Sequence, residues 1–313
     1  MNSPFPTHPS ALYRLFPAFA SGRSLSLLLV FGLCFCGKAF GASYSWDPNS
    51  TSGAAVGGSG TWDASVTPPL KWFNGAIDAP WPNDTTVDPT LTAVFAGAVG
   101  TVSVSGSLNV NSVVFQTSGY VIQSGTLAFG GTTPTISFGS PGMSGTINTV
   151  ITGTSGLTIS GSGSVLALGG SANTYTGTTT LSAGTYLRLN SPTATGSNQN
   201  PGQPLSMNNG SSLELNILNG VQVFNNINVT GTATLLTGTA ATGTINIGNN
   251  TATNNGAISS SGTARLIFSN SGSSPTLSLS GSMNGFTGSL VWDSSAPSAV
   301  VVRANGTTNQ NLG

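Results

Sequence analysis

Carboxylates are the side chains of this sequence with the clearest potential for acid–base chemistry. The chain of 313 residues contains one histidine, His8, and two cysteines, Cys34 and Cys36, all before residue 42. The part that follows can form no Ser-His-Asp triad, no Cys-His pair and no usual zinc or copper site. Its acids are Asp47, Asp63, Asp78, Asp84, Asp88, Glu214 and Asp293.

Two roles are open to these acids. Paired carboxylates can cleave glycosides, and elongated β-proteins often host polysaccharide-cleaving enzymes. Aspartate is also a good turn and cap residue, and five of the seven acids fall in one loop-rich segment, residues 42–100. The turn role is the stronger interpretation, so we predict no catalytic residue and no enzyme activity.

One glycine-rich segment is similar to a calcium-binding pattern. Gly57–Asp63 reads Gly-Gly-Ser-Gly-Thr-Trp-Asp, which is close to the nonapeptide repeat that binds calcium. Its aspartate comes one position late, and the pattern occurs in one copy. We therefore predict a glycine turn before a strand, with no metal and no cofactor.

Four of the five tryptophans fall in the same segment as the aspartates, and they allow two interpretations. Their faces could stack on pyranose rings while neighbouring aspartates accept hydroxyl hydrogen bonds, which would make a glycan-binding surface. Alternatively they form a small core of their own, in which each indole N–H finds a carbonyl. The residues are Trp46, Trp62, Trp72 and Trp81.

Composition narrows the fold class to all-β. Only 4% of the residues are charged, against about 25% in typical soluble domains, and the hydrophobic fraction of 38% argues against charge-rich disorder. Threonine suits strands, whereas glycine and asparagine suit turns. Beyond residue 41, four basic residues face seven acids, so no basic patch exists to bind nucleic acid.

The N-terminus predicts export. Residues 25–37 form an apolar run that has the length of a signal-peptide core and is too short for an ordinary membrane span. Small residues at Ala39 and Gly41 place cleavage after Gly41, so that residues 1–41 are the signal peptide. Both cysteines leave with this segment, and the mature chain then has no disulfide.

Two segments follow the predicted signal peptide. Residues 42–100 are rich in Trp, Asp and Pro, and we expect an irregular cap that covers one end of a stack of strands. Residues 101–313 are regular, with short apolar runs between Gly, Asn, Ser and Pro. We expect strands at Leu157–Ile159, Val165–Leu168 and Tyr186–Leu189, and then at Val102–Val104, Leu108–Phe115, Gly119–Gln123, Thr126–Phe129, Thr135–Phe138, Ile147–Ile151, Ser212–Ile217, Val223–Val229, Thr244–Ile247, Ala264–Phe268, Thr276–Leu279, Ser289–Trp292 and Ala299–Arg303.

The strand pattern favours a solenoid. No segment has helical periodicity, and Leu277–Gly281 with Asn284–Gly288 mirrors Leu166–Gly170 with Asn173–Gly177 at the same offset. We predict an all-β, right-handed parallel β-helix over residues 101–313; a β-sandwich or jelly roll is the alternative. Alternation in the strands places Arg188 and Glu214 on the face away from the core, and a one-residue slip would bury them.

The tract around residues 157–190 carries a resemblance to a known family. Leu168–Leu181 reads LGGSANTYTGTTTL, and Gly184-Thr-Tyr-Leu187 continues it. This resembles the autotransporter-associated β-strand repeat, also called the passenger-associated transport repeat, whose pattern is L-x-G-x-N-T-Y-T-G-x-T-T-V followed by G-x-L. A weaker copy lies near residues 276–292. The matching residues are Leu168, Gly170, Asn173, Tyr175, Thr176, Gly177, Gly184 and Leu187.

The resemblance implies an autotransporter-like passenger that is secreted or displayed on the surface of a Gram-negative-type bacterium. In that family the repeat is associated with efficient secretion and contributes no catalytic residue. The implied partner is the outer-membrane translocation machinery, or a C-terminal barrel that this chain lacks. We therefore expect an incomplete gene product. An adhesin or glycan-binding module that contacts extracellular polysaccharide is the second hypothesis, and a carboxylate-based glycoside-cleaving enzyme is the third.

Overall fold

The computed structural model describes residues 42–50, 56–196, 203–218, 222–223, 225–247, 257–272, 275–283, 285–299 and 301–304. The expected signal peptide, with its cleavage point at Gly41, lies outside this range. Twenty-eight strands and no helix occur among the described residues. Accordingly, they include no helix long and apolar enough to cross a membrane.

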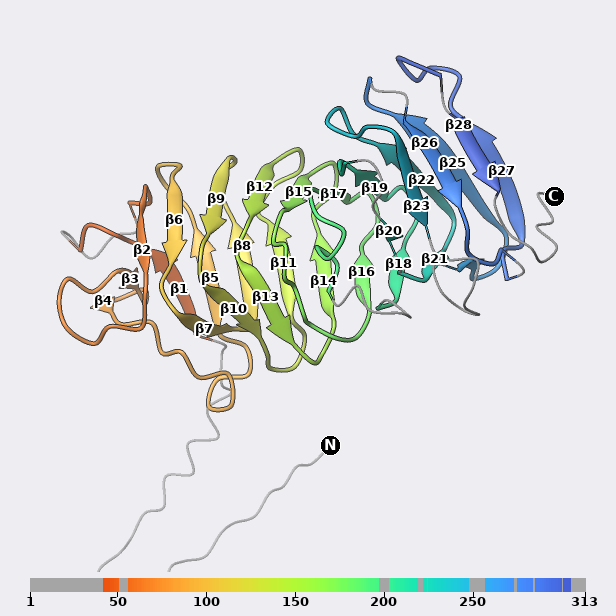
Figure 1. Cartoon of the computed structure of the whole chain (residues 1–313). Helices are drawn as coiled ribbons and strands as arrows, with labels where there is room; N and C mark the ends of the chain where they lie inside the picture. Colours follow the sequence, from red (N-terminus) through yellow and green to blue (C-terminus); the bar gives the residue numbers. More distant parts are fainter. Residues whose placement is uncertain are drawn as a thin grey trace, which may run out of the picture. The chain divides into compact units, whose positions relative to one another are not determined.

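The strands stack into a parallel β-helix whose coils have three faces (Figure 1). Each regular coil passes from the first face to the second, then to the third, and returns to the first one coil further along. The first face is an eleven-stranded sheet in the order β4 (Asp78–Ala79), β3 (Trp72–Phe73), β1 (Ser43–Trp46), β5 (Thr92–Phe95), β8 (Ser112–Phe115), β11 (Thr135–Phe138), β14 (Leu157–Ser160), β16 (Thr179–Leu181), β18 (Leu205–Met207), β21 (Ile227–Val229) and β24 (Ile258–Ser260).

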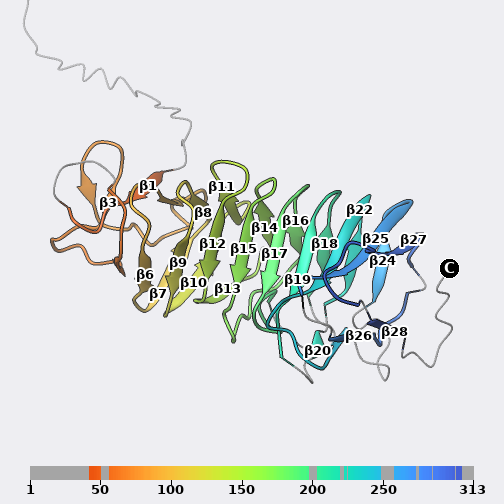
Figure 2. The same ribbon diagram turned by 90° about the horizontal axis from the view of Figure 1, so that it is seen from above.

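The second face runs beside the first as a ten-stranded sheet, and Figure 2 shows its strands in sequence along the stack. All of its pairings are parallel. Its members are β2 (Gly60–Trp62), β6 (Thr101–Val104), β9 (Tyr120–Gln123), β12 (Ser144–Ile147), β15 (Val165–Leu168), β17 (Tyr186–Leu189), β19 (Ser212–Leu215), β22 (Thr232–Thr237), β25 (Ala264–Asn270) and β27 (Gly288–Trp292).

The third face is interrupted. One three-stranded sheet holds β7 (Ser107–Val110), β10 (Thr126–Phe129) and β13 (Val150–Gly153), and a four-stranded sheet holds β20 (Gln222–Val223), β23 (Thr244–Ile247), β26 (Thr276–Leu279) and β28 (Val301–Ala304). Between the two sheets, the side of the coil after β15 is formed by the tract that contains Asn173. The repeat motif therefore lies where the third face has no strand.

The core is built from in-register rows of apolar side chains. On the first face Val113, Ile136, Ile159 and Leu181 pair in successive coils, and none is exposed. Because side chains alternate along a strand, every second residue enters the interior. Each such aliphatic side chain contributes roughly 1.5–3 kcal/mol on burial. The predicted parallel β-helix is thus confirmed, and the sandwich alternative, which rests on antiparallel sheets, does not describe the chain.

Three predicted strands are wrong because each is two strands joined by a corner. Leu108–Phe115 divides into β7 and β8 at Asn111, Ile147–Ile151 is replaced by β12 and β13 around Asn148, and Val223–Val229 divides at Asn225. Asn111 and Asn225 are buried. The Nδ2 of Asn111 donates to the Gly130 carbonyl and that of Asn225 to the Gln203 carbonyl, each at a distance of 2.7 Å. These corners could not be predicted from the apolar runs, because a polar residue within such a run is normally an outward-facing position of a continuous strand. The prediction also missed β16, β18, β22 and β24.

Glycine is required where coils approach most closely, and this generates a first prediction. Gly177 has φ +89°, and a Cβ there would lie 2.6 Å from the Gly156 nitrogen. Gly142 has φ +75° with no atom within 4 Å of the same position. Gly177→Ala should cost about 2–5 kcal/mol, because backbone strain adds to overpacking. Gly142→Ala should cost only about 1–2 kcal/mol for the strain.

The measurement is the denaturant midpoint of the two variants against the parent chain. Equal losses in both would show that left-handed backbone geometry, rather than coil-to-coil contact, makes Gly177 necessary.

Candidate functional site

Asn173 joins three successive coils through its side chain. Its Oδ1 accepts the N–H of Ile151 at 2.7 Å, and its Nδ2 donates to the carbonyl of Ala194 at 3.0 Å. The residue is 2% exposed, so both bonds form away from water. Asn173 therefore replaces main-chain pairing at a corner where no strand could provide it.

Tyr175 fills the interior of the same corner. Its ring is 2% exposed, and its hydroxyl lies 2.7 Å from the Thr179 hydroxyl. Burial raises the pKa of Tyr175 far above its ordinary value, so the phenol stays neutral at any physiological pH. The intervening Thr174 and Thr176 have exposed side chains, while their N–H groups donate to the carbonyls of Ile151 and Gly153, each at 2.9 Å. In this tract the buried side chains of Asn173 and Tyr175 thus alternate with the exposed side chains of Thr174 and Thr176.

The remaining motif residues serve coil stacking too. Leu168 and Leu187 belong to the core with no exposed surface. A Cβ on Gly170 would lie 2.4 Å from the Thr149 carbonyl oxygen, and one on Gly184 would lie 3.0 Å from the Ser162 hydroxyl. The structure therefore brings the predicted repeat residues together as a packing unit. Apart from the exposed hydroxyl of Thr176, these residues offer no nucleophile or proton-transfer group to solvent.

The weaker copy of the repeat occupies a different side of the coil. In the first copy the Leu-x-Leu sequence lies in β15 on the second face, but Leu277 and Leu279 lie in β26 on the third face. Gly285 then bridges Ser259 on the first face, and Phe286 packs against the core. Asn284 itself lies outside the described residues. The two copies of the repeat therefore both lie at a turn of the coil, but they connect different faces of the β-helix.

The four cap tryptophans pack on one another. The ring centroids of Trp62 and Trp81 are 4.9 Å apart, those of Trp72 and Trp81 are 4.7 Å apart, and those of Trp46 and Trp72 are 5.1 Å apart. None is more than 2% exposed. The indole N–H of Trp46 donates to Gly58 at 2.8 Å and that of Trp81 to Asn109 at 3.0 Å. The indole N–H groups of Trp62 and Trp72 are buried without a partner, so the expectation of a carbonyl for each indole is wrong for these two. Burial favours the alternative in which these residues are the core of the cap, because no face is open to a sugar ring.

Most acids of the chain act in turns or ion pairs. Asp84 accepts from Thr86 and Val87, and Asp293 accepts from Ser295 and Ser269; these hydrogen bonds lower the pKa of both carboxyls. Asp88 accepts from Ala42 and Thr90. The structure thus supports the turn role that aspartate chemistry favoured.

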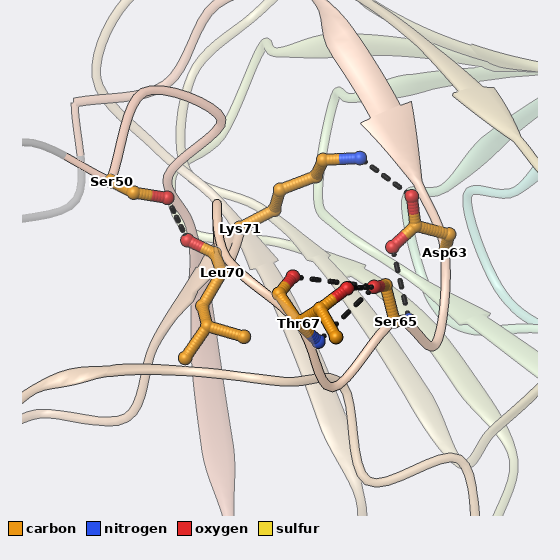
Figure 3. A network of polar contacts seen from close by, with 6 residues as sticks. All are labelled: Ser50, Asp63, Ser65, Thr67, Leu70 and Lys71. Atoms are coloured by element: carbon orange, nitrogen blue, oxygen red, sulfur yellow. Dashed lines mark hydrogen bonds and ion pairs between the residues drawn. The ribbon is translucent and has the colours of Figure 1, made fainter.

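Asp63 belongs to a polar network at the cap (Figure 3). Its Oδ2 lies 2.6 Å from the Lys71 ammonium, and its Oδ1 accepts the Ser65 N–H at 3.1 Å. On the other side of the same loop, the Ser50 hydroxyl donates to the Leu70 carbonyl. Lys71 is the one basic residue between positions 42 and 100, and its charge is committed to Asp63.

Asp47 and Asp78 depart from this pattern. Asp47 is fully buried, and neither of its carboxylate oxygens has a hydrogen-bond partner; Asp78 Oδ1 is buried and unpartnered as well. Burial and then the neighbouring Asp78 charge raise the pKa of Asp47, and the backbone N–H groups of Asn49 and Ser50 only partly oppose this rise. Beside Asp78 opens a cavity of about 520 Å³ lined by Asn49, Ser50, Pro68, Pro69, Leu70 and Asp78. Both acids are candidates from the sequence, but their spacing of 31 residues gives no sign that they lie close together.

No larger acidic cluster was found: nowhere among the described residues do three or more His, Cys, Asp or Glu side chains come together in a way that could hold a metal ion. The glycine turn predicted for the Gly57–Asp63 segment is present. Gly57 has φ +71° and Gly58 has φ +102°, and β2 follows directly.

Glu214 is buried on the outer side of the second face, which corrects the expectation that this register leaves it in solvent. Arg188 pairs with Glu214 across adjacent coils, and Arg188 Nε lies 2.6 Å from Glu214 Oε2. The Tyr186 hydroxyl donates to the same oxygen at 2.7 Å. Gly238 leaves the necessary room, because a Cβ there would lie 2.5 Å from Glu214 Oε1. Burial, followed by the Glu214 contact, raises the pKa of Tyr186 to about 12.

Comparison with known proteins supplies the context for this architecture. Over 206 residues the chain is 36% identical to a protein of Brucella suis biovar 1 (strain 1330) named Adhesin BmaC autotransporter. This chain therefore resembles the passenger part of an autotransporter. The aligned region covers 62% of this chain and 5% of that relative, so the chain spans a small part of the relative's length. No family model matches the chain, and no solved structure matches it. The resemblance predicted from the repeat tract is confirmed at this level.

Asn173 should be a major stability determinant of the repeat corner. Asn173→Ala leaves a buried N–H and a buried carbonyl unpaired, and each such group costs about 1–3 kcal/mol. We expect a loss of about 2–5 kcal/mol in the free energy of unfolding, measured by urea denaturation. The matched control is Thr174→Ala, whose side chain is exposed in the same tract. A loss in Thr174→Ala as large as that in Asn173→Ala would contradict the pinning role.

Removing one partner of the Arg188–Glu214 pair should destabilise the protein more than replacing both partners by apolar residues. Arg188→Met leaves the fully buried Glu214 carboxylate without its counter-charge, and breaking a buried pair costs about 3–5 kcal/mol. Because the Arg188 side chain is 40% exposed, we expect about 2–3 kcal/mol, at the low end of such effects. The double variant Arg188→Met with Glu214→Met should recover most of this loss in thermal denaturation. A double variant less stable than Arg188→Met would show that Glu214 stabilises the coils by itself.

Proposed function

We propose that this chain is a surface-displayed or secreted passenger segment of an autotransporter, and that its β-helix serves extension and export. One observation carries the proposal: a regular parallel β-helix coincides with 36% identity to an autotransporter adhesin over 206 residues. The outer-membrane translocation context follows from that relative. The bacterium is then of the Gram-negative type.

The physical basis of the proposed export role is directional stacking. Each coil completes the backbone hydrogen bonds and covers the apolar rows of the coil before it, so folding can propagate along the stack as the chain emerges. Such propagation needs every coil to dock, including those without a third-face strand. We propose that the repeat residues around Asn173 and Tyr175 promote secretion by providing that docking.

Adhesion is a second candidate, and two observations favour it. The relative is named an adhesin, and the cap carries an open cavity lined by polar Asn49, Ser50 and Asp78 beside two prolines and a leucine. A glycan would have to enter this cavity, since the four indoles are buried. No catalytic role is proposed for the acids, because most are engaged in turns and ion pairs.

Export competence can be measured with the chain fused ahead of an autotransporter translocator in a Gram-negative host. Surface display is quantified by cleavage with added protease. We expect Asn173→Ala and Tyr175→Ala to reduce display several-fold, because the corner docks poorly, while Thr174→Ala displays like the parent. The same cells are then tested for adherence to a glycan panel.

Unchanged display of both corner variants, with lowered stability established in purified chain, would remove the export role of the repeat. Adherence to no member of the panel would count against the adhesin candidate alone.

A further inference from the structure

The buried pair formed by Asp47 and Asp78 lacks the partners that every other cap carboxylate has. Asp47 follows β1, and its own N–H donates to the Lys71 carbonyl at 3.0 Å, which places it beside the start of β3. Asp78 begins β4, the strand paired with β3. Phe73 pairs with both Ser45 and Asp78. Because side chains alternate along a strand, Asp47, two residues after Ser45, lies on the same side of the β1–β3–β4 sheet as Asp78. The Asp78 charge accordingly acts on the Asp47 carboxyl. Three of their four oxygens are buried without a partner.

Such a pair needs a neutralising partner. A buried carboxylate without a counter-charge or hydrogen bond is strongly unfavourable, and two adjacent ones repel each other. The protein offers no cation for this purpose in the cap, because Lys71 is the one basic residue there and its ammonium lies 2.6 Å from Asp63 (Figure 3). The partner must therefore come from solution, as a proton or as a metal ion.

The surroundings favour a metal ion bound by oxygen. Asp78 lines the 520 Å³ cavity together with Asn49 and Ser50, whose side chains carry an amide oxygen and a hydroxyl that could add to the carboxylate ligands. Ca²⁺ accepts six to eight oxygen ligands from carboxylates, carbonyls, amides and water in irregular geometry. The loop that follows Asp47, in which Ser50 has φ +49°, provides irregular geometry of this kind. Mg²⁺ requires near-octahedral geometry and releases its water reluctantly.

We propose that Asp47 and Asp78 form a calcium site at the edge of the cap. The two carboxylates are the protein's anionic ligands, and oxygen atoms at the cavity and water complete the shell. A bound ion ties β1 to the β3–β4 hairpin and secures the end of the first face. This site is separate from the Gly57–Asp63 segment and does not depend on the proposed function.

Terbium luminescence provides a direct test, since Tb³⁺ replaces Ca²⁺ in oxygen sites and is sensitised by nearby indoles. Trp46 immediately precedes Asp47, and Trp72 pairs with Trp46 in the adjacent strand. With the purified full chain stripped by EDTA, we expect tryptophan-excited Tb³⁺ emission that CaCl₂ displaces. The expected dissociation constant for Ca²⁺ is about 10⁻⁴–10⁻³ M, the range of weak calcium sites with few charged ligands. In thermal denaturation, 10 mM CaCl₂ should raise Tm by roughly 3–8 °C.

Three variants assign the response to the pair. Asp47→Asn and Asp78→Asn should lose both the emission and the calcium-dependent rise in Tm. In EDTA at pH 7, Asp47→Asn should melt no lower than the parent chain, because it removes an unpaired buried charge; this readout separates loss of the ligand from loss of the fold. Asp84→Asn is the matched control, since Asp84 is a cap aspartate in an exposed turn, and it should keep the full response.

Three results would overturn the proposal. One is a parent chain that neither sensitises Tb³⁺ nor gains stability with CaCl₂, while its Tm rises as pH falls from 7 to 4; the pair then shares a proton. The second is an unchanged calcium response in folded Asp47→Asn. The third is an equal rise in Tm with MgCl₂, which would contradict the preference for calcium. If both variants fail to fold, displacement of Tb³⁺ from the parent chain still decides whether the site binds calcium.

Discussion

Parallel pairing between successive coils is the interaction on which the rest of this structure depends. A strand in the stack hydrogen-bonds to the coil before and the coil after it, and the same register places Val113, Ile136, Ile159 and Leu181 in one continuous buried row. Hydrogen bonding and apolar burial therefore demand the same alignment. A slip by one residue would turn the row outward and bring polar threonines and serines into the core.

The corners are the places where this alignment is most difficult to maintain, because main-chain groups there leave the sheets. Buried asparagines solve the problem: Asn111, Asn173 and Asn225 each donate to a carbonyl of another coil. An asparagine side chain carries the same donor and acceptor as a peptide group, so it substitutes for a missing strand partner. The conspicuous tract around Asn173 and Tyr175 is one instance of this device, used where the third face has no strand.

Charge is scarce along the stack, and where it is buried the structure treats it in two ways. Glu214 Oε2 is bound by Arg188 and Tyr186 from the neighbouring coil, and Gly238 makes room for the carboxylate, although its Oε1 is buried without a partner. Asp47 and Asp78, at the start of the chain's first face, meet with no protein cation left to pair with them. The regular stack thus supplies a counter-charge for its buried carboxylate, whereas the cap, built around four packed indoles, retains a carboxylate pair with no counter-charge beside an open cavity.

Local sequence properties predict the all-β class and the stacked parallel strands, because low charge, Gly corners and short alternating runs do not depend on distant contacts. The likeness to autotransporter passengers came instead from the resemblance of the tract at residues 157–190 to a known repeat. The sequence also predicted some strands with their observed bounds, such as Thr126–Phe129 and Thr135–Phe138. Only the tertiary structure decided where apolar runs turn a corner, as at Asn111, since the partner carbonyl at Gly130 belongs to another coil. The same holds for the burial of Trp46, Trp62, Trp72 and Trp81 and for the meeting of Asp47 with Asp78. These depend on contacts between segments far apart in the chain, which no local pattern encodes.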